Sequence, residues 1–106
     1  MVTLHHAKIQ HNNHGVVAES LSSLIWIKGE RTEISDNMGK GVYAANHAEI
    51  LLGYGIEAIN NGTSLSGGGI WRRNSFNYET FNGGWIRQQK SLKNEHNESH
   101  VILSSD

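Results

Sequence analysis

The chain contains no cysteine and no proline. Without cysteine, disulfide frameworks, zinc sites with cysteine ligands and thiol nucleophiles are excluded. Without proline, the turns must be made by glycine and asparagine, and both are abundant. The N-terminal segment lacks a basic stretch followed by a long apolar run, so no signal peptide is expected, and no apolar run is long enough to span a bilayer. These absences predict a soluble cytoplasmic protein.

Charge of one sign is also lacking, since the formal net charge is −1 over 106 residues. A chain of this length predicts one domain, residues 1–106, with one modest core. No global field would steer it to nucleic acid or to a membrane. Locally, the segment from Trp71 to Lys93 contains five cationic residues and one acidic residue, Glu79. They form either a solvated hairpin face or, with Trp71 and Trp85 beside them, a surface for nucleic acid. The cations are Arg72, Arg73, Arg87, Lys90 and Lys93.

The apolar spacing predicts an α+β fold in which strands are combined with two helices. Apolar side chains recur at intervals of three and four in two segments, which are therefore expected to be helices. Alternating or short apolar runs predict the strands, and Asn82-Gly83-Gly84 predicts a hairpin turn. No internal repeat is evident. The expected helices are 16–28 and 45–61, and the expected strands are 2–9, 41–45, 70–81, 85–89 and 100–103.

The most specific motif is Gly39-Lys40-Gly41-Val42-Tyr43, followed eleven residues after Tyr43 by Gly53-Tyr54. Glycines beside each tyrosine remove side-chain bulk at the place where a ligand would lie. Two rings held at this spacing could close on a flat heteroaromatic ligand from both sides. The motif therefore predicts that Tyr43 and Tyr54 line one pocket.

This motif resembles the NAD-binding core of the diphtheria-type ADP-ribosyltransferases, which include the poly(ADP-ribose) polymerases. The resemblance implies a compact ADP-ribosyltransferase-like fold with a small split β-sheet and two helices. It also implies a mono-ADP-ribosyltransferase that moves ADP-ribose from NAD to a macromolecular target, of the kind found as a toxin or a phage-type effector. In this family the nicotinamide pocket begins at the Gly-Lys-Gly-aliphatic-Tyr run. Leu51 stands where many polymerases have a serine, which removes one expected hydrogen bond to the carboxamide.

The resemblance extends to the expected first strand, Leu4-His5-His6-Ala7-Lys8. His6 matches the family histidine that fixes the ribose. Ala7 replaces the family glycine whose backbone holds the carboxamide, and alanine has the same backbone groups. The residues implied to bind NAD are His6, Ala7, Gly41, Tyr43 and Tyr54.

The resemblance also implies a carboxylate that stabilises the ribosyl cation as positive charge develops. Glu98, in Asn97-Glu98-Ser99, fits the family context at the C-terminal end of the chain. Glu79 is the alternative. The implied catalytic set is therefore His6, Tyr43 and Glu98.

Two other functions stay open. The same tyrosine pocket could bind NAD-like or cyclic nucleotides without catalysis, or the chain could be a small toxin ribonuclease with His6 or His14 as base and Arg72 and Arg73 on the phosphates. His47-Ala48-Glu49 is similar to part of a zinc deaminase motif, but the chain has no Cys-x-x-Cys to complete that site. No metal site is expected, because the N-terminal histidines match no ligand spacing.

Overall fold

The computed structural model describes residues 2–21, 23–29, 31–62, 77–90 and 99–104. Within these ranges the chain forms strands and turns and no helix, and no helix there is long and apolar enough to cross a membrane. The strands are short, mostly of three to five residues. They are β1 (Val2–His5), β2 (Lys8–Gln10), β3 (Val16–Ala18), β4 (Leu24–Lys28), β5 (Glu33–Ser35), β6 (Val42–Ala45), β7 (Glu49–Leu52), β8 (Ala58–Ile59), β9 (Tyr78–Phe81), β10 (Trp85–Gln89) and β11 (Ser99–Ser104).

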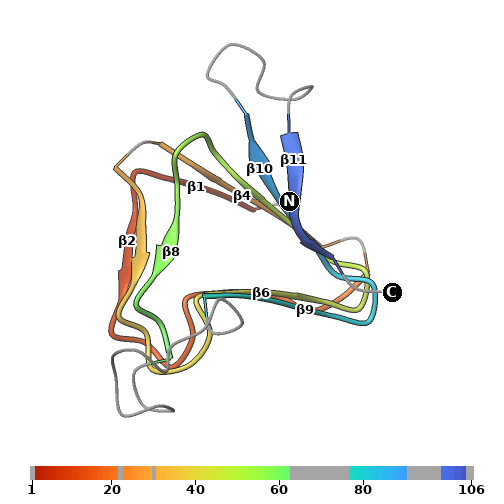
Figure 1. Cartoon of the computed structure of the whole chain (residues 1–106), viewed down its shortest axis with the longest axis horizontal. Helices are drawn as coiled ribbons and strands as arrows, with labels where there is room; N and C mark the ends of the chain where they lie inside the picture. The colour runs from red at the N-terminus through yellow and green to blue at the C-terminus, as the bar shows by residue number, and fades with distance from the viewer. Residues whose placement is uncertain (1, 22, 30, 63–76, 91–98, 105–106) are drawn as a thin grey trace.

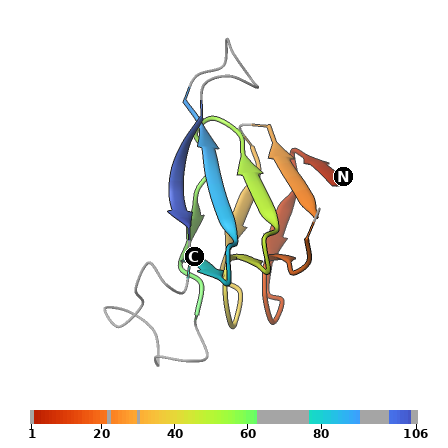
Figure 2. The same ribbon diagram turned by 90° about the vertical axis from the view of Figure 1, so that its right-hand side faces the viewer.

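The strands make three sheets, and successive strands as far as β10 step from one sheet to the next. Sheet A has the order β1-β4-β7-β10-β11, sheet B has β2-β5-β8, and sheet C has β3-β6-β9. All neighbouring strands are parallel except β10 and β11. The chain is therefore a three-sided parallel β-helix. Figure 1 looks along the stacking direction, and Figure 2 shows sheet A face on, from β11 to β1.

The register of the sheets defines a structural repeat. Val2 pairs with Ile25, 23 residues later, and Lys8 pairs with Glu33, 25 residues later. The last turn is longer, because residues 63–76 lie between β8 and β9. The expectation of no internal repeat is therefore wrong. The repeat is one of backbone conformation, in which each turn supplies one strand to each sheet.

The core fills the space between the three sheets. Along each strand alternate side chains point inward, so the buried residues of neighbouring turns stack on one another: Ile27 is in register with Leu52, and Ile50 with Ile86. Each of these large aliphatic side chains contributes about 1.5–3 kcal/mol when it is removed from water. Those that are fully buried are Ile27, Ile34, Val42, Ile50, Leu52, Ile56 and Ile86.

The corners between the sheets need a left-handed backbone, which asparagine, aspartate, histidine and glycine tolerate better than other residues. Between sheets B and C this position is held by His11, Asp36 and Asn60, with φ of 59°, 55° and 54°. Between sheets C and A, Asn46 and Asn82 take the same conformation, with φ of 54° and 46°. The abundance of asparagine and glycine is thus explained by the corners.

A ladder of buried asparagines runs up the corner between sheets B and C. Asn37 and Asn61 are completely buried. Asn61 Oδ1 accepts hydrogen bonds from Asn37 N at 3.2 Å and from Asn37 Nδ2 at 2.8 Å. Asn61 Nδ2 donates to Asn77 Oδ1 at 3.0 Å, and Asn12 N donates to Asn37 Oδ1 at 3.1 Å. The ladder therefore satisfies the buried polar groups of this corner from one turn to the next.

The predicted α+β class, a split sheet with two helices, is wrong. The expected helix 16–28 is β3 and β4, and the expected helix 45–61 is β7 and β8. Short strands broken by corners place apolar residues at intervals of three and four, which imitates a helical face. Gly55, expected inside the second helix, has φ of 79° in a turn between β7 and β8.

The expected strands are present in part, and one pairing is wrong. The strand expected at 2–9 is broken into β1 and β2, which belong to different sheets, and the described part of the strand expected at 70–81 contains β9. β6 and β11 confirm the strands expected at 41–45 and 100–103, and β10 matches the one expected at 85–89. However, β9 and β10 do not form a hairpin around Asn82-Gly83-Gly84. β9 belongs to sheet C and β10 to sheet A, so this turn is a corner of the β-helix.

Candidate functional site

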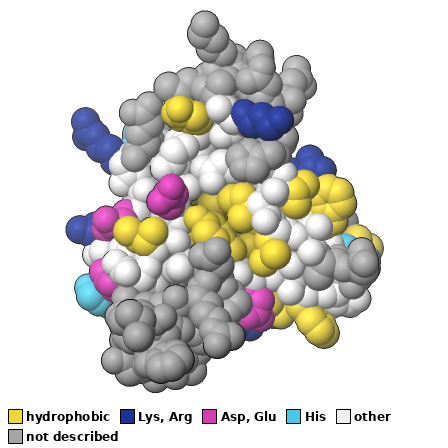
Figure 3. All heavy atoms as spheres, in the orientation of Figure 1, with side chains coloured by type: hydrophobic (Ala, Val, Ile, Leu, Met, Phe, Trp, Pro, Cys, Tyr) yellow, Lys and Arg dark blue, Asp and Glu magenta, His cyan; other side chains and the backbone are white. Residues whose placement is uncertain are grey.

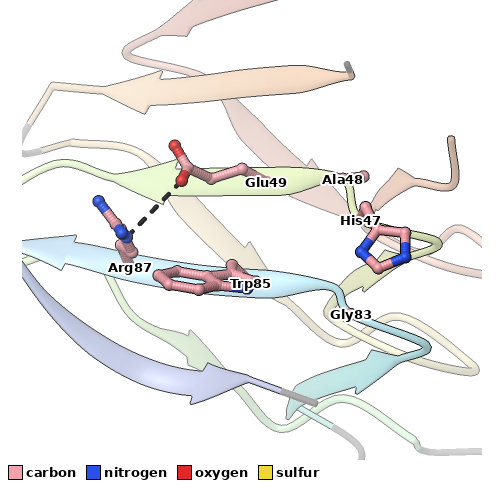
Figure 4. Close-up of a pocket in the computed structure, with 6 residues that line it drawn as sticks. All are labelled: His47, Ala48, Glu49, Gly83, Trp85 and Arg87. Atoms are coloured by element: carbon pink, nitrogen blue, oxygen red, sulfur yellow. Dashed lines mark ion pairs between the residues drawn. The ribbon is translucent and has the colours of Figure 1, made fainter. Parts of the chain in front are cut away.

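An open hollow of about 230 Å³ lies on the outer face of sheet A, close to its corner with sheet C. It is formed by two successive turns of the β-helix, β7 with its preceding corner and β10 with its preceding corner (Figure 4). The lining residues are His47, Ala48, Glu49, Gly83, Trp85 and Arg87.

The alternation of β7 and β10 directs the polar side chains into this hollow. Ile50 and Ile86 are completely buried and point to the core. Their neighbours Glu49, Trp85 and Arg87 must therefore point outward. Glu49 is directly opposite Trp85 in the parallel register of β7 and β10, so the carboxylate and the indole ring come from adjacent strands.

Glu49 and Arg87 form an ion pair across the hollow, with 3.6 Å between Arg87 Nε and Glu49 Oε2. The guanidinium also lies over the Trp85 ring, 4.5 Å from its centroid. Trp85 is 39% exposed, although its ring is large and apolar. The side chains of Glu49 and Arg87 are partly exposed. An ion pair between such side chains contributes about 1 kcal/mol or less to stability, so a ligand could displace either partner at low cost.

His47 closes the corner end of the hollow. It has φ of 67°, and its ring packs against Gly83, where an added Cβ would collide with the imidazole. The two corners stack through hydrogen bonds from Asn46 N to Phe81 O and from His47 N to Asn82 O, each 3.0 Å long. The position of His47 therefore depends on glycine at residue 83.

The hollow offers an exposed aromatic ring, a carboxylate acceptor and a guanidinium donor within one small space. Among the residues that the structure describes, no group of three or more metal-ligating side chains occurs. The pKa of Tyr78 is raised, mainly because burial disfavours the phenolate. Tyr78 packs against the core, so this shift belongs to the interior and not to the hollow.

The structure places the residues implied to bind NAD on two different sides of the β-helix. His6, Ala7 and Tyr54 lie at the corner between sheets A and B, because they follow β1 and β7 and precede β2 and β8. Ala7 N donates to Thr32 Oγ1 at 3.2 Å. Tyr43 lies in β6, within sheet C. Since the core separates sheet C from the corner between A and B, the rings of Tyr43 and Tyr54 do not face each other.

Tyr43 has a different partner. Lys40 Nζ lies 4.0 Å from the Tyr43 ring centroid and 2.6 Å from Glu79 Oε2, so these three side chains form one cluster on the outer face of sheet C. Gly41 is buried, and an added Cβ there would collide with the Asn61 side chain. This glycine is thus required by the asparagine ladder.

Glu98 lies outside the described residues, as do Trp71, Arg72, Arg73 and Lys93. Of the expected nucleic-acid surface, the structure describes Trp85 and Arg87 in the hollow and Lys90 after β10. Figure 3 shows the lysine and arginine side chains of one face at several separate places, with acidic side chains beside those on the left and at the bottom. On that face the described cations do not form a continuous basic patch.

From the sequence, Trp85 and Arg87 were predicted to belong to a nucleic-acid surface. Their proximity to His47 and Glu49 was not predicted. A signal was available in β10, where Trp85 and Arg87 alternate with Ile86 and so share one face. The pairing of β10 with β7 could not be read from spacing, because residues 63–76 break the period. Comparisons of the chain with protein-family models, with curated proteins and with solved structures found no match.

Proposed function

We propose that this chain is a ligand-binding β-helix and that the hollow between the His47 and Gly83 corners binds a saccharide. The observation that carries the proposal is the half-exposed Trp85 ring beside the Glu49–Arg87 ion pair. A large exposed indole costs free energy in water, and a ligand with a flat apolar face would recover part of it.

A sugar ring suits this composition. One side of the ring carries C–H groups that pack on an indole, and its edge carries hydroxyls that both donate and accept hydrogen bonds. Glu49 can accept from hydroxyls and Arg87 can donate to them. The two charges compensate each other, so the hollow matches a neutral polar ligand better than a highly charged one.

A nucleotide is the second candidate, and the observation that favours it is the contact of Arg87 with Trp85. A base could stack on the indole while the guanidinium binds a phosphate. The carboxylate of Glu49, 3.6 Å from Arg87 Nε, opposes this reading because it would repel the phosphate. Binding of a nucleotide would weaken with added salt, because salt screens the attraction between Arg87 and the phosphate, whereas binding of a neutral sugar would not.

The test is to titrate the protein with neutral oligosaccharides, acidic oligosaccharides and mononucleotides. Binding is measured by calorimetry and by tryptophan fluorescence. We expect saturable binding of a neutral saccharide, and Trp85→Ala should weaken it about tenfold or more, the loss of one well-placed contact. The matched control is Tyr54→Ala, which removes a ring that is 47% exposed at a different corner. Equal affinity in Trp85→Ala and the parent protein would refute the site.

Transfer of ADP-ribose from NAD stays a prediction of the sequence resemblance. The pocket of two tyrosines from which we inferred it is not formed, so it is not part of our proposal. Release of nicotinamide from NAD is its test, and cleavage of RNA without NAD is the test of the ribonuclease alternative with His6 or His14 as base.

A further inference from the structure

The chain contains two asparagine–glycine pairs, Asn61-Gly62 and Asn82-Gly83, and the fold treats them in opposite ways. We propose that Asn82 is a site of spontaneous deamidation beside the hollow, while Asn61 is protected by the β-helix. The pair forms the corner between β9 and β10, and Gly83 lines the hollow itself. Modification there would change the charge of the hollow.

The reaction needs only water. The backbone nitrogen of Gly83 loses its proton and attacks Cγ of Asn82, forming a new N–C bond while the Cγ–Nδ2 bond breaks and ammonia leaves. The resulting cyclic imide then adds water at one of its two carbonyl carbons and opens to aspartate or isoaspartate. Glycine favours the first step, because it has no side chain to obstruct the approach of its own nitrogen.

In the second pair the Asn82 side chain is exposed and Gly83 is buried, but the described residues hold the two reacting groups with fewer hydrogen bonds than in the first pair. Asn82 is exposed, and its side chain makes one hydrogen bond, from Nδ2 to Asn46 Oδ1 at 2.8 Å. No described residue accepts a hydrogen bond from the Gly83 backbone nitrogen. The nucleophile is therefore not engaged, and rotation of the Asn82 amide toward it breaks a single exposed bond.

The same groups are held in place in the first pair. Asn61 is completely buried, and its amide nitrogen donates to Ile34 O, Ile59 O and Asn77 Oδ1. The Gly62 nitrogen donates to Asn37 O at 2.9 Å. Deamidation of Asn61 would require the asparagine ladder to open first, and such opening is rare in a stable core.

Deamidation at residue 82 would alter the hollow in two ways. A carboxylate cannot donate to Asn46 Oδ1, so the two oxygens would repel each other, and a new negative charge would be added next to Gly83, which lines the hollow. Isoaspartate would in addition lengthen the backbone between the Phe81 and Asn82 carbonyls, which now accept from the Asn46 and His47 nitrogens. The His47 side of the hollow would then lose its fixed position.

The experiment is to incubate the native protein at mildly alkaline pH and to follow both sites by peptide mass spectrometry. We expect residue 82 to deamidate about tenfold faster than residue 61 or more, because residue 61 must wait for local opening. The matched control is the same incubation in denaturant, where both pairs should react at similar rates since their local sequences are alike. Equal rates in the native protein would overturn the proposal, and so would an unmodified Asn82 after a time in which the denatured chain has reacted.

A second measurement tests the structural consequence without relying on the saccharide proposal. The deamidated fraction, separated by anion exchange, should unfold at a lower temperature than the parent protein, and Asn82→Asp should show the part that is due to charge. Identical midpoints for all three proteins would show that residue 82 does not support the stacked corners.

Discussion

Asparagine has two distinct roles in this molecule at the scale of single residues. On the outside, residues such as Asn46 and Asn82 supply left-handed corners. Inside, Asn37 and Asn61 replace the hydrogen bonds that the backbone of a corner cannot make within the sheets. A buried amide that loses such partners costs more free energy than an exposed one, because nothing else satisfies the groups left behind.

We predict that Asn61→Ala lowers the free energy of unfolding by at least about 2 kcal/mol. The substitution removes the Asn61 amide, to which the Asn37 backbone nitrogen donates and from which the carbonyl oxygens of Ile34 and Ile59 accept. Urea unfolding followed by circular dichroism measures this. The control is Asn13→Ala, at an exposed asparagine, which should change the stability by less than about 0.5 kcal/mol. Similar losses in both variants would contradict the role of the ladder.

Tyr78 gives a prediction that depends on pH. Its Oη accepts a hydrogen bond from Ala58 N at 2.9 Å, and burial raises its pKa above the ordinary value of 10.0. Because the raised pKa means that the folded state holds this proton more tightly, its contribution to stability is complete below pH 10 and is lost as the pH rises through the folded pKa.

Tyr78→Phe should therefore cost about 1–2 kcal/mol at neutral pH, because the buried Ala58 nitrogen loses its acceptor. Above about pH 10 the parent protein should lose stability relative to the variant. Urea unfolding of both proteins across this range measures the difference, and parallel stability curves would show that the phenol does not titrate differently in the folded state.

At the scale of elements, the corners set the limits on substitution more than the strands do. Gly84 directly precedes β10, and an added Cβ there would meet the carbonyl carbon and oxygen of Ala44, which belong to the backbone of β6. A flexible side chain could move away, but a backbone within a sheet cannot do so without shifting its neighbours.

Gly84→Ala should therefore lower the free energy of unfolding by about 3 kcal/mol, at the upper end of the usual cost of overpacking. Gly55→Asn is the matched control. Gly55 has φ of 79° with nothing within 4 Å of an added Cβ, and asparagine tolerates a left-handed backbone. Thermal and urea unfolding of both variants would decide, and an unaffected Gly84→Ala protein would contradict the close approach to Ala44.

The elements also show how far the sequence could lead. β6, β10 and β11 could be predicted from short apolar or alternating runs, and the corner at Asn82-Gly83 from its turn residues. The two expected helices failed for a physical reason. Around β7 and β8, the inward residues Leu52 and Ile56 come from a strand of sheet A and from the corner after it, and their spacing imitates a helical stripe. Only the stacking of one turn on the next distinguishes the two folds, and that information is not local.

The candidate site was equally hard to predict from sequence. Trp85 and Arg87 could be placed on one face by their alternation, but Glu49 lies 36 residues before Trp85 and is its direct neighbour in the sheet. The tyrosine motif misled for a related reason. Gly41 makes room for the asparagine ladder, so a glycine that suggested a ligand pocket instead serves the packing of the corner.

For the whole molecule, the β-helix topology predicts how the chain folds. Every strand of sheets B and C pairs with a strand from the neighbouring turn, so nearly all pairing is between residues far apart in sequence. Chains of this kind fold in milliseconds to seconds. The absence of proline removes the isomerisation that often slows folding to tens of seconds or more.

We therefore predict that refolding from urea is complete within seconds and has no phase in the range of tens of seconds. Stopped-flow tryptophan fluorescence, with both short and long delays in denaturant before refolding, measures this. A slow phase whose amplitude grows with the delay in denaturant would contradict the prediction, because such behaviour is typical of proline isomerisation.

The long last turn has a consequence for engineering. Residues 63–76 separate Gly62 from Asn77 in the sequence, and Asn61 N donates a hydrogen bond of 3.0 Å to Asn77 Oδ1. The two ends are thus joined by the ladder, whatever the length of the chain between them. Doubling the length of a flexible loop costs only about 0.6 kcal/mol. This position should accept a grafted foreign peptide, so the longest turn of the β-helix also provides a place for display.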